Sequence, residues 1–389
     1  MRVYLDHNAT TPLRAEARVA MLAAMDVVGN PSSVHAEGRA AKALVERARA
    51  QVATALACDP AEVVFTSGAT EAINLVFAQP WDEAACSPLE HDAVLRQTYA
   101  LHDDPHTGAP LIGRDGVFNG ALVSGFGFYA QRAKRGEPGF GRAARGLFAL
   151  TAANAETGVL QPLHPVFAEF AGEMEVSHRF CDATQAFGKV PFSYRDTPCE
   201  YASVSAHKIG GPKGVGALVV KQGVDISAGL KGGGQEMGRR SGTENVIGIA
   251  GFGAAAEAAA HDVAAGHWEA VAEKRDLMES ALEAASNTTI LVGKDAPRLP
   301  NTSCLVTAGW KGETQVMQMD LAGFAISAGS ACSSGKVKAS TVLQAMGYDE
   351  SEASSAIRVS LGLETTQDDV LRFADAWAAK LKKHEARAA

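Results

Sequence analysis

The chain has 389 residues, of which 47% are apolar and 21% charged, and its formal net charge is −8. This length is enough for the cores of two domains. The acidic balance and the lack of a Lys/Arg run argue against a nucleic-acid or membrane partner. The N-terminal stretch MRVYLDHNATTP is not a signal peptide, and the longest apolar window, around 246–256, is too short to span a bilayer. We therefore expect a cytoplasmic protein.

The six cysteines include no C-x-x-C pair and no zinc-ligand spacing beside a histidine pair. Cysteines in a cytoplasmic protein are normally reduced. We expect free thiols and no metal site.

The first two thirds of the chain alternate between helical and strand-like patterns. Residues 36–57 repeat apolar positions at four-residue spacing, as a helix does. Residues 63–65 form a short β-branched and aromatic run that Ser67 and Gly68 end, and a helix follows. Strand-like runs recur in GLFALT, RFCDATQ, YASVSAH and GALVVK. This alternation predicts an α/β domain with a largely parallel sheet. Residues 104–145 are Gly-rich with weak periodicity, and we assign no elements there.

From about residue 260 the pattern changes. AVAEKRDLMESALEAAS reads as an amphipathic helix, and AIRVSLG alternates like a strand with one face buried. Thr366 and Asp369 form a helix cap, and an apolar stripe follows. The stripe consists of Val370, Phe373, Ala374, Trp377 and Leu381. These elements predict a smaller α+β domain. The apolar run NVIGIAGFGAAAEAAA predicts a helix buried in a core or in a subunit interface.

Lys208 follows the strand-like run SVSAH and precedes a glycine-rich turn. When a lysine is shielded from solvent, its pKa is lowered. The neutral amine is then a nucleophile that can form a Schiff base. A lone lysine is more often an exposed loop residue. Its neighbours in the predicted sheet therefore decide whether Lys208 is a catalytic amine or an exposed loop residue.

Three other segments at predicted strand ends suit one cofactor. SGATE, with Thr70, offers a helix N-terminus for a phosphate. CDATQ places Asp182 where a carboxylate can pair with a protonated ring nitrogen, as pyridoxal phosphate enzymes require. LEHDAVL offers His91 for stacking and proton transfer. Each residue could be structural by itself, but ligands of such sheets bind where the strands end.

Cys332 lies in SAGSACSSG, in which every other residue is Ser, Ala or Gly. A segment of this composition predicts a loop in which the thiol can swing between two positions. The related string GSACSSGK resembles a P-loop, but it has five residues between the glycines and Val337 after the lysine. We reject nucleotide binding there.

In combination these segments resemble the pyridoxal 5'-phosphate (PLP)-dependent cysteine desulfurases of the NifS/IscS type, in the class V aminotransferase group of fold type I. The matching pieces include YLDHNATTP, VVFTSGATEAINL, CDATQAFGK, SVSAHKIGGPKGVGAL, GGGQEMGRRSGTEN and ISAGSACSSGKVKASTVLQAMG, in order across nearly the whole chain. The resemblance implies a large domain at 13–258 with a mostly parallel, seven-stranded mixed sheet flanked by helices. It implies a smaller α+β domain, formed by 1–12 and 259–389, that carries the cysteine loop.

The resemblance also implies a role for each matching residue. Lys208 would be the Schiff-base lysine. Asp182 would pair with the pyridine nitrogen, Gln185 would bond the phenolic oxygen, and His91 would stack on the ring. The phosphate ligands would be Ala69, Thr70, Ser205, His207 and, from the second subunit of a homodimer, Thr243. Asn154 and Arg358 would bind the substrate carboxylate, and Cys332 would be the nucleophile that accepts sulfur.

The implied activity converts L-cysteine to L-alanine and passes a persulfide to an acceptor protein, such as an Fe–S scaffold. A selenocysteine lyase or a class V aminotransferase on the same scaffold is the first alternative. A non-catalytic paralogue that keeps the fold is the second. The sequence names neither the sulfur acceptor nor the rate.

Overall fold

The large sheet has seven strands in the order β2-β8-β7-β6-β5-β3-β4. The computed structural model describes residues 2–103, 110–119, 145–167, 178–329 and 339–388. Strand β8 pairs antiparallel with β2 and β7, and the other pairs are parallel. The predicted mixed, mostly parallel sheet is therefore confirmed. The strands are β2 Val63–Thr66, β3 Glu83–Cys86, β4 Tyr99–Ala100, β5 Gly146–Thr151, β6 His178–Asp182, β7 Tyr201–Ser205 and β8 Gly216–Val220.

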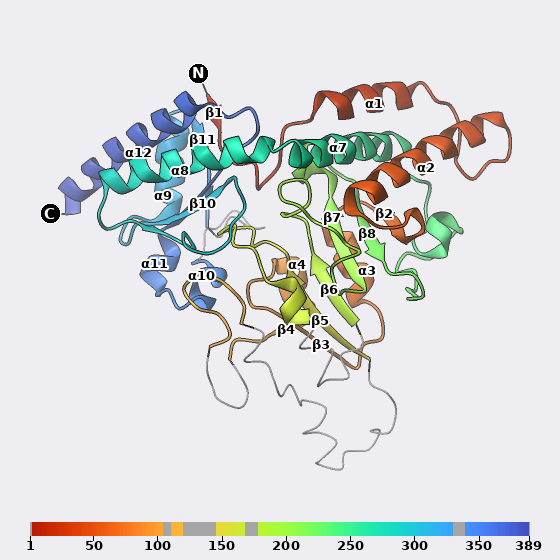
Figure 1. Ribbon diagram of the computed structural model, residues 1–389, viewed down its shortest axis with the longest axis horizontal. Coiled ribbons are helices and arrows are strands. Elements are labelled where there is room, and N and C mark those ends of the chain that lie inside the picture. Colours follow the sequence, from red (N-terminus) through yellow and green to blue (C-terminus); the bar gives the residue numbers. More distant parts are fainter. Residues whose placement is uncertain (1, 104–109, 120–144, 168–177, 330–338, 389) are drawn as a thin grey trace, which may run out of the picture.

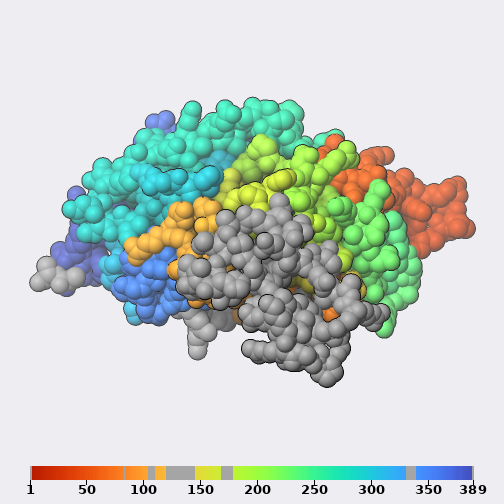
Figure 2. Space-filling view, turned by 60° about the horizontal axis from the view of Figure 1, so that its bottom comes forward, coloured from red at the N-terminus to blue at the C-terminus, as the bar shows by residue number. Residues whose placement is uncertain are grey.

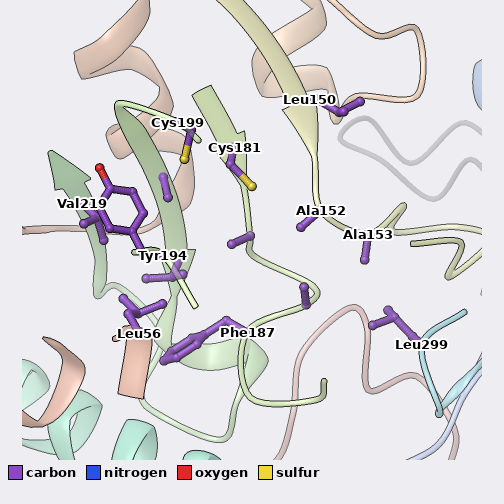
Figure 3. Packing of buried hydrophobic residues seen from close by; sticks show 14 of the residues in the cluster. Leu56, Leu150, Ala152, Ala153, Cys181, Phe187, Tyr194, Cys199, Val219 and Leu299 are labelled. Carbon is purple, nitrogen blue, oxygen red and sulfur yellow. The ribbon is translucent and has the colours of Figure 1, made fainter. Parts of the chain in front are cut away.

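Helices cover both faces of this sheet. Successive residues of a strand point to opposite faces. Phe65 accordingly packs in the cluster that contains Phe252, whereas its neighbour Val64 packs in a different cluster with Ile73. Because both faces are buried, strands such as β2 and β8 are almost wholly apolar. Figure 1 shows α1, α2 and α7 together along one side of the molecule, and Figure 3 shows part of the first cluster. The covering helices are α1 Ala15–Met25, α2 Ala36–Leu56, α3 Ala69–Phe77, α4 Asp92–Leu95 and α7 Val246–Ala264.

The alanine-rich helix α7 is buried by its own chain. It packs against α1 and α2, and a Cβ at Gly253 would lie 2.6 Å from the Ala48 Cα. Small residues allow this close approach of two helices. Of the two predicted settings, the protein core therefore accounts for this helix without a second subunit.

The second part of the chain has its own core. Its antiparallel sheet has the order β12-β13-β10-β9, and β1 pairs in parallel with β11. Leu5, near the N-terminus, packs with Trp310 and Trp377 in this core. The boundaries of the two domains remain a prediction. The separate core supports the division into two domains. The elements are β1 Val3–Tyr4, β9 Ile290–Leu291, β10 Thr302–Val306, β11 Phe324–Ala325, β12 Ser327–Ala328, β13 Ala356–Ser360, α8 His267–Ala285, α9 Gly312–Leu321, α10 Thr341–Ala345, α11 Glu350–Ser354 and α12 Gln367–Ala388.

One prediction for this part is wrong and another is confirmed. Strand β13 is buried on both faces, because Ile357 packs in the second core while Arg358 faces the first part of the chain through Ala155. The helix cap is as predicted: the Thr366 and Asp369 side chains each accept the other's backbone N–H. The apolar stripe of α12 is buried.

Residues 110–119 join the two parts. Arg114 donates to the Glu352 carboxylate at 2.9 Å, and its guanidinium lies 4.4 Å from the ring centre of Tyr348. Figure 2 shows this orange stretch against the blue C-terminal residues. In the described part of the chain, no helix combines the length and apolarity needed to cross a membrane.

Candidate active site

A cavity of about 890 Å³ lies between the two parts of the chain, where strands β6 and β7 end and helix α3 begins. Most of the predicted site residues line it. They are Ala69, Thr70, His91, Asn154, Asp182, Gln185, Ser205, His207, Lys208 and Arg358. The structure thus brings together side chains that are up to about 290 positions apart in sequence, as expected at the carboxyl edge of a parallel sheet.

The amine of Lys208 is held at this cavity by the N-terminal segment. Lys208 ends a short 3₁₀ turn, η3 (Ala206–Lys208), that follows β7. Its Nζ donates to the backbone oxygens of Asn8 at 2.6 Å and Ala9 at 3.0 Å. The hydroxyl of Thr11 donates to the Lys208 carbonyl at 3.0 Å. The amine and its backbone are therefore both fixed by residues 8–11.

The carboxylate of Asp182 has one oxygen occupied and one available. Oδ1 accepts hydrogen bonds from the Thr184 backbone N–H, the Thr184 hydroxyl and the Ser203 hydroxyl at 3.0, 2.5 and 3.0 Å. Among the described residues, none donates to Oδ2. The side chain is buried at the end of β6. A fixed, buried carboxylate with a free oxygen is suited to a cationic N–H in the cavity.

The first turn of α3 forms an anion site with β7. The leading N–H groups of a helix have no partner inside the helix and attract anions. The turn before α3 lies close to the sheet, since a Cβ at Gly216 would lie 2.7 Å from the Gly68 Cα. Ser205 and His207 complete the wall.

His207 contributes as a neutral ring. Burial, with Lys208 and Lys213 nearby, lowers its pKa to about 4. Its Nδ1 lies 3.1 Å from the Thr10 hydroxyl. In the tautomer in which Nδ1 accepts that hydroxyl, Nε2 carries a hydrogen that can be donated to an anion.

Arg358 and Asn154 differ in the hydrogen-bonding groups that remain unused by the protein. Arg358 donates to Asp6 at 2.8 Å and to the Ala155 carbonyl at 3.0 Å, while its buried Nε has no partner in the described part of the chain. The Oδ1 of Asn154 accepts three hydrogen bonds from Glu156 and Thr157. Arg358 therefore retains a donor for a substrate anion, whereas Asn154 chiefly shapes the turn that follows it.

His91 caps helix α4 and has a buried acidic neighbour. The His91 Nδ1 accepts the Ala93 N–H at 3.0 Å, so the ring orientation is set by its own helix. Glu90 also lines the cavity. Its Oε1 accepts the Thr151 N–H at 2.6 Å, and its Oε2 has no partner among the described residues. Burial, with the Asp182 charge nearby, raises the pKa of Glu90 well above its usual range.

The site predicted from the sequence lacked Glu90, Asn8 and Lys189. Asn8 lines the cavity, and Lys189 lies behind Gln185. A signal was present for two of them, because Glu90 directly precedes His91 in LEHDAVL and Asn8 falls in the matched YLDHNATTP. Nothing in the local pattern of AFGKVPF indicates the partners of Lys189.

Two predicted residues are not part of the described cavity. Thr243 is exposed and does not line it. Its loop lies near α3, because Arg240 donates to Glu71 at 2.9 Å. Cys332 lies outside the described residues. Gly329 and Ala339, on either side of residues 330–338, both line the cavity.

Comparisons with known proteins agree on one family. The aminotransferase class-V family matches residues 3–105 and 142–373. A cysteine desulfurase from Cereibacter sphaeroides is 40% identical over 385 residues, which covers 96% of this chain and 94% of that protein. The cysteine desulfurase IscS of Dictyoglomus turgidum is 34% identical and covers 95% of this chain and 91% of its own. The structure of a NifS-like protein from Rickettsia africae has a TM-score of 0.84 at 28% identity, covering 98% of this chain and 100% of that one.

Proposed function

The chain belongs to the aminotransferase class-V family, and from that premise we propose that it is a cysteine desulfurase that converts L-cysteine to L-alanine. Sulfur would leave as a persulfide on Cys332 and pass to an acceptor thiol. One structural observation carries the proposal. Gly329 and Ala339, which flank the segment with Cys332, line the same cavity as Lys208 and Asp182. The full-length similarity to cysteine desulfurases supports it.

The cofactor of this activity would be PLP, and the cavity fits it. Asp182 Oδ2 is free to accept from a protonated ring nitrogen. The α3 N-terminus with Ser205 and His207 suits the phosphate, and His91 would lie on the ring. When bound, PLP supplies an electron sink that stabilises negative charge at the substrate Cα.

The residues of the chain would supply the remaining chemistry. Arg358 would bind the substrate carboxylate through its unpaired Nε. Lys208, held by two backbone carbonyls, is placed to hold and move a proton at Cα. The Cys332 thiolate would attack the substrate sulfur and form an S–S bond while the C–S bond breaks. A proton would then be added to the carbon that becomes the alanine methyl group.

A homodimer is part of this proposal. The support is a row of exposed apolar side chains on α1 and the turn after it: Val19, Leu22, Met25 and Val28 are 67%, 53%, 55% and 81% exposed. Exposed apolar surface of this extent is typical of an interface. Thr243 of each subunit would then complete the phosphate site of its partner. The acceptor would be a sulfur-using protein such as an Fe–S scaffold.

The test is a product assay on the purified protein with PLP, L-cysteine and a dithiol. We expect equimolar sulfide and alanine from the wild type and from Cys58→Ala, which changes a buried cysteine away from the cavity, and neither product from Cys332→Ala. If the Cys332→Ala variant forms both products as fast as the wild type, a lyase replaces the desulfurase; if the protein forms a keto acid in place of alanine, a transaminase does. If PLP binds but no product forms, the chain is a non-catalytic paralogue.

A further inference from the structure

Lys189 is a buried amine that the proposed chemistry does not use. Lys189 is only 2% exposed, and it takes part in none of the ion pairs among the described residues. Its Nζ donates to Gln185 Oε1 at 2.7 Å and to Asn8 Oδ1 at 3.1 Å. Burying an amine without a counter-ion is costly, so these two contacts point to a specific role.

The contact with Lys189 fixes which way the Gln185 amide faces. On its other side, Gln185 Nε2 donates to the backbone oxygen of Asn8 at 3.0 Å. A carbonyl oxygen can only accept, and the lysine amine donates to Oε1. A reversed amide would place two acceptors against each other. The second N–H of Nε2 is therefore the group that Gln185 has left for the cavity it lines.

The contact with Asn8 connects Lys189 to the reactive amine. Asn8 Oδ1 also accepts from Asn301 at 3.1 Å, and Asn8 Nδ2 donates to Thr302 at 2.9 Å. With its side chain held in this way, the Asn8 carbonyl accepts the Lys208 amine at 2.6 Å. Lys189 itself does not line the cavity, but it contacts Gln185 and Asn8, which do.

We propose that Lys189 is a positioning residue that keeps Gln185 as a hydrogen-bond donor toward the phenolic oxygen of the cofactor and keeps Asn8 against Lys208. The inference rests on the proposed function, because it assumes PLP in this cavity. Burial, with Lys208 and Arg358 nearby, lowers the pKa of Lys189 well below its usual value. Both the charged and the neutral amine keep N–H groups for its two oxygen partners.

The test compares Lys189→Met, which has a similar volume and no donor, with Lys189→Gln, which keeps an N–H donor. PLP affinity is measured by equilibrium titration, alongside the absorbance of the bound cofactor and the melting temperature. We expect Lys189→Met to bind PLP about tenfold more weakly. Its absorbance should shift toward the shorter-wavelength band, because a phenolate without a donated hydrogen bond is protonated more readily. Lys189→Gln should recover most of both properties.

A second comparison separates positioning from general stability. In the Gln185→Leu background, Lys189→Met should weaken PLP binding by clearly less than tenfold, since one of the two residues through which it acts is gone and only the contact with Asn8 remains. An undiminished loss in that background overturns the proposal, as does a Lys189→Met variant with wild-type affinity and spectrum. If Lys189→Met does not fold, Lys189→Gln decides, and a shifted spectrum despite its donor overturns the proposal. If the wild type itself does not bind PLP, the proposed function fails first.

Discussion

Arg49 and Glu236 form a two-pronged ion pair beneath the strand that leads to α3. Arg49 Nη1 and Nη2 lie 2.7 and 2.8 Å from the two carboxylate oxygens of Glu236, and both side chains are buried. Glu236 also accepts the Phe65 N–H at 2.8 Å. It does so from a left-handed backbone conformation, with φ 48°, which is unfavourable for a residue with a side chain. The pair therefore joins α2, β2 and the loop that precedes Thr243.

We predict that Glu236→Gln lowers the free energy of unfolding by about 3–5 kcal/mol, because it removes the buried carboxylate from Arg49 and leaves this guanidinium only the half-exposed Glu46 as an ion-pair partner. Urea denaturation followed by circular dichroism measures it. The matched control is Glu283→Gln, which breaks the exposed pair with Lys294 and should cost less than about 1 kcal/mol. Equal losses in the two variants would show that the buried pair has no special weight.

Thiol labelling should single out Cys332. The other five cysteines, Cys58, Cys86, Cys181, Cys199 and Cys304, are buried. Burial raises the pKa of each of their thiols, to about 12 for Cys58. Because the thiolate is the reactive form, we expect about one equivalent of iodoacetamide per native chain and almost none in Cys332→Ala, as counted by mass spectrometry. Rapid labelling of several cysteines in the native protein would contradict this.

Asp182→Asn should reduce the rate of alanine formation by roughly 10²–10³-fold, the scale for removing a preorganised charge from an active site. The amide can keep the contacts of Oδ1 but offers no charge at the second atom. Ser203→Ala is the control, since it removes one of the three hydrogen bonds to Oδ1 and leaves the carboxylate; we expect a loss of less than about tenfold. If Asp182→Asn is as mild as Ser203→Ala, the carboxylate does not serve the ring nitrogen.

Mixing two differently impaired variants tests whether Thr243 acts in the partner subunit. Thr243→Ala should weaken PLP retention, and Lys208→Ala should abolish turnover. If each site uses Lys208 of one subunit and Thr243 of the other, a mixed dimer has one intact site. Equimolar exchange of subunits should then restore intact PLP retention in about a quarter of all sites. Assays of PLP content and alanine formation before and after exchange measure this recovery, and its absence would mean that both residues serve the same subunit's site.

His7 should make the fold sensitive to acid. Burial, followed by the nearby charge of Lys189, lowers its pKa from 6.5 to about 4. Between these pH values the unfolded chain binds the proton that the folded chain excludes. Stability is therefore complete above about pH 6.5 and falls toward pH 4, by at most about 1.4 kcal/mol per pH unit.

The measurement for His7 is urea denaturation at pH 7 and pH 5 for the wild type and His7→Asn. The variant should lose less stability between the two pH values, because it has no proton to bind at this position. The same pH dependence in both proteins would assign the acid sensitivity to other groups, among them His207.

The strand ends were the part of the site that could be predicted from sequence. Lys208 and Asp182 each follow an apolar run, and the parallel topology brings such ends to one edge. Lys189 could not be found in this way, because its partners include Asn8, and nothing in the local pattern indicates that pairing. The same reason explains β13: periodicity reports how residues alternate along a strand, but not that a second part of the chain covers the polar face.

What buries helix α7 could likewise not be predicted from the sequence. An apolar helix can be buried by its own chain or by another subunit, and the two cases have the same composition. Only its packing against α1 and α2 decides between them.

Strand β1 pairs with β11, so that Val3 lies opposite Phe324, and residues 8–11 continue from this pairing to Lys208. During synthesis the chain emerges from its N-terminus, and domains generally fold as units as they appear. The seven-stranded sheet can form once residue 264 has left the ribosome, but β1 has no partner until about sixty residues later. The reactive amine is thus secured only when nearly the whole chain exists, and a truncated product of translation would hold an incomplete cavity.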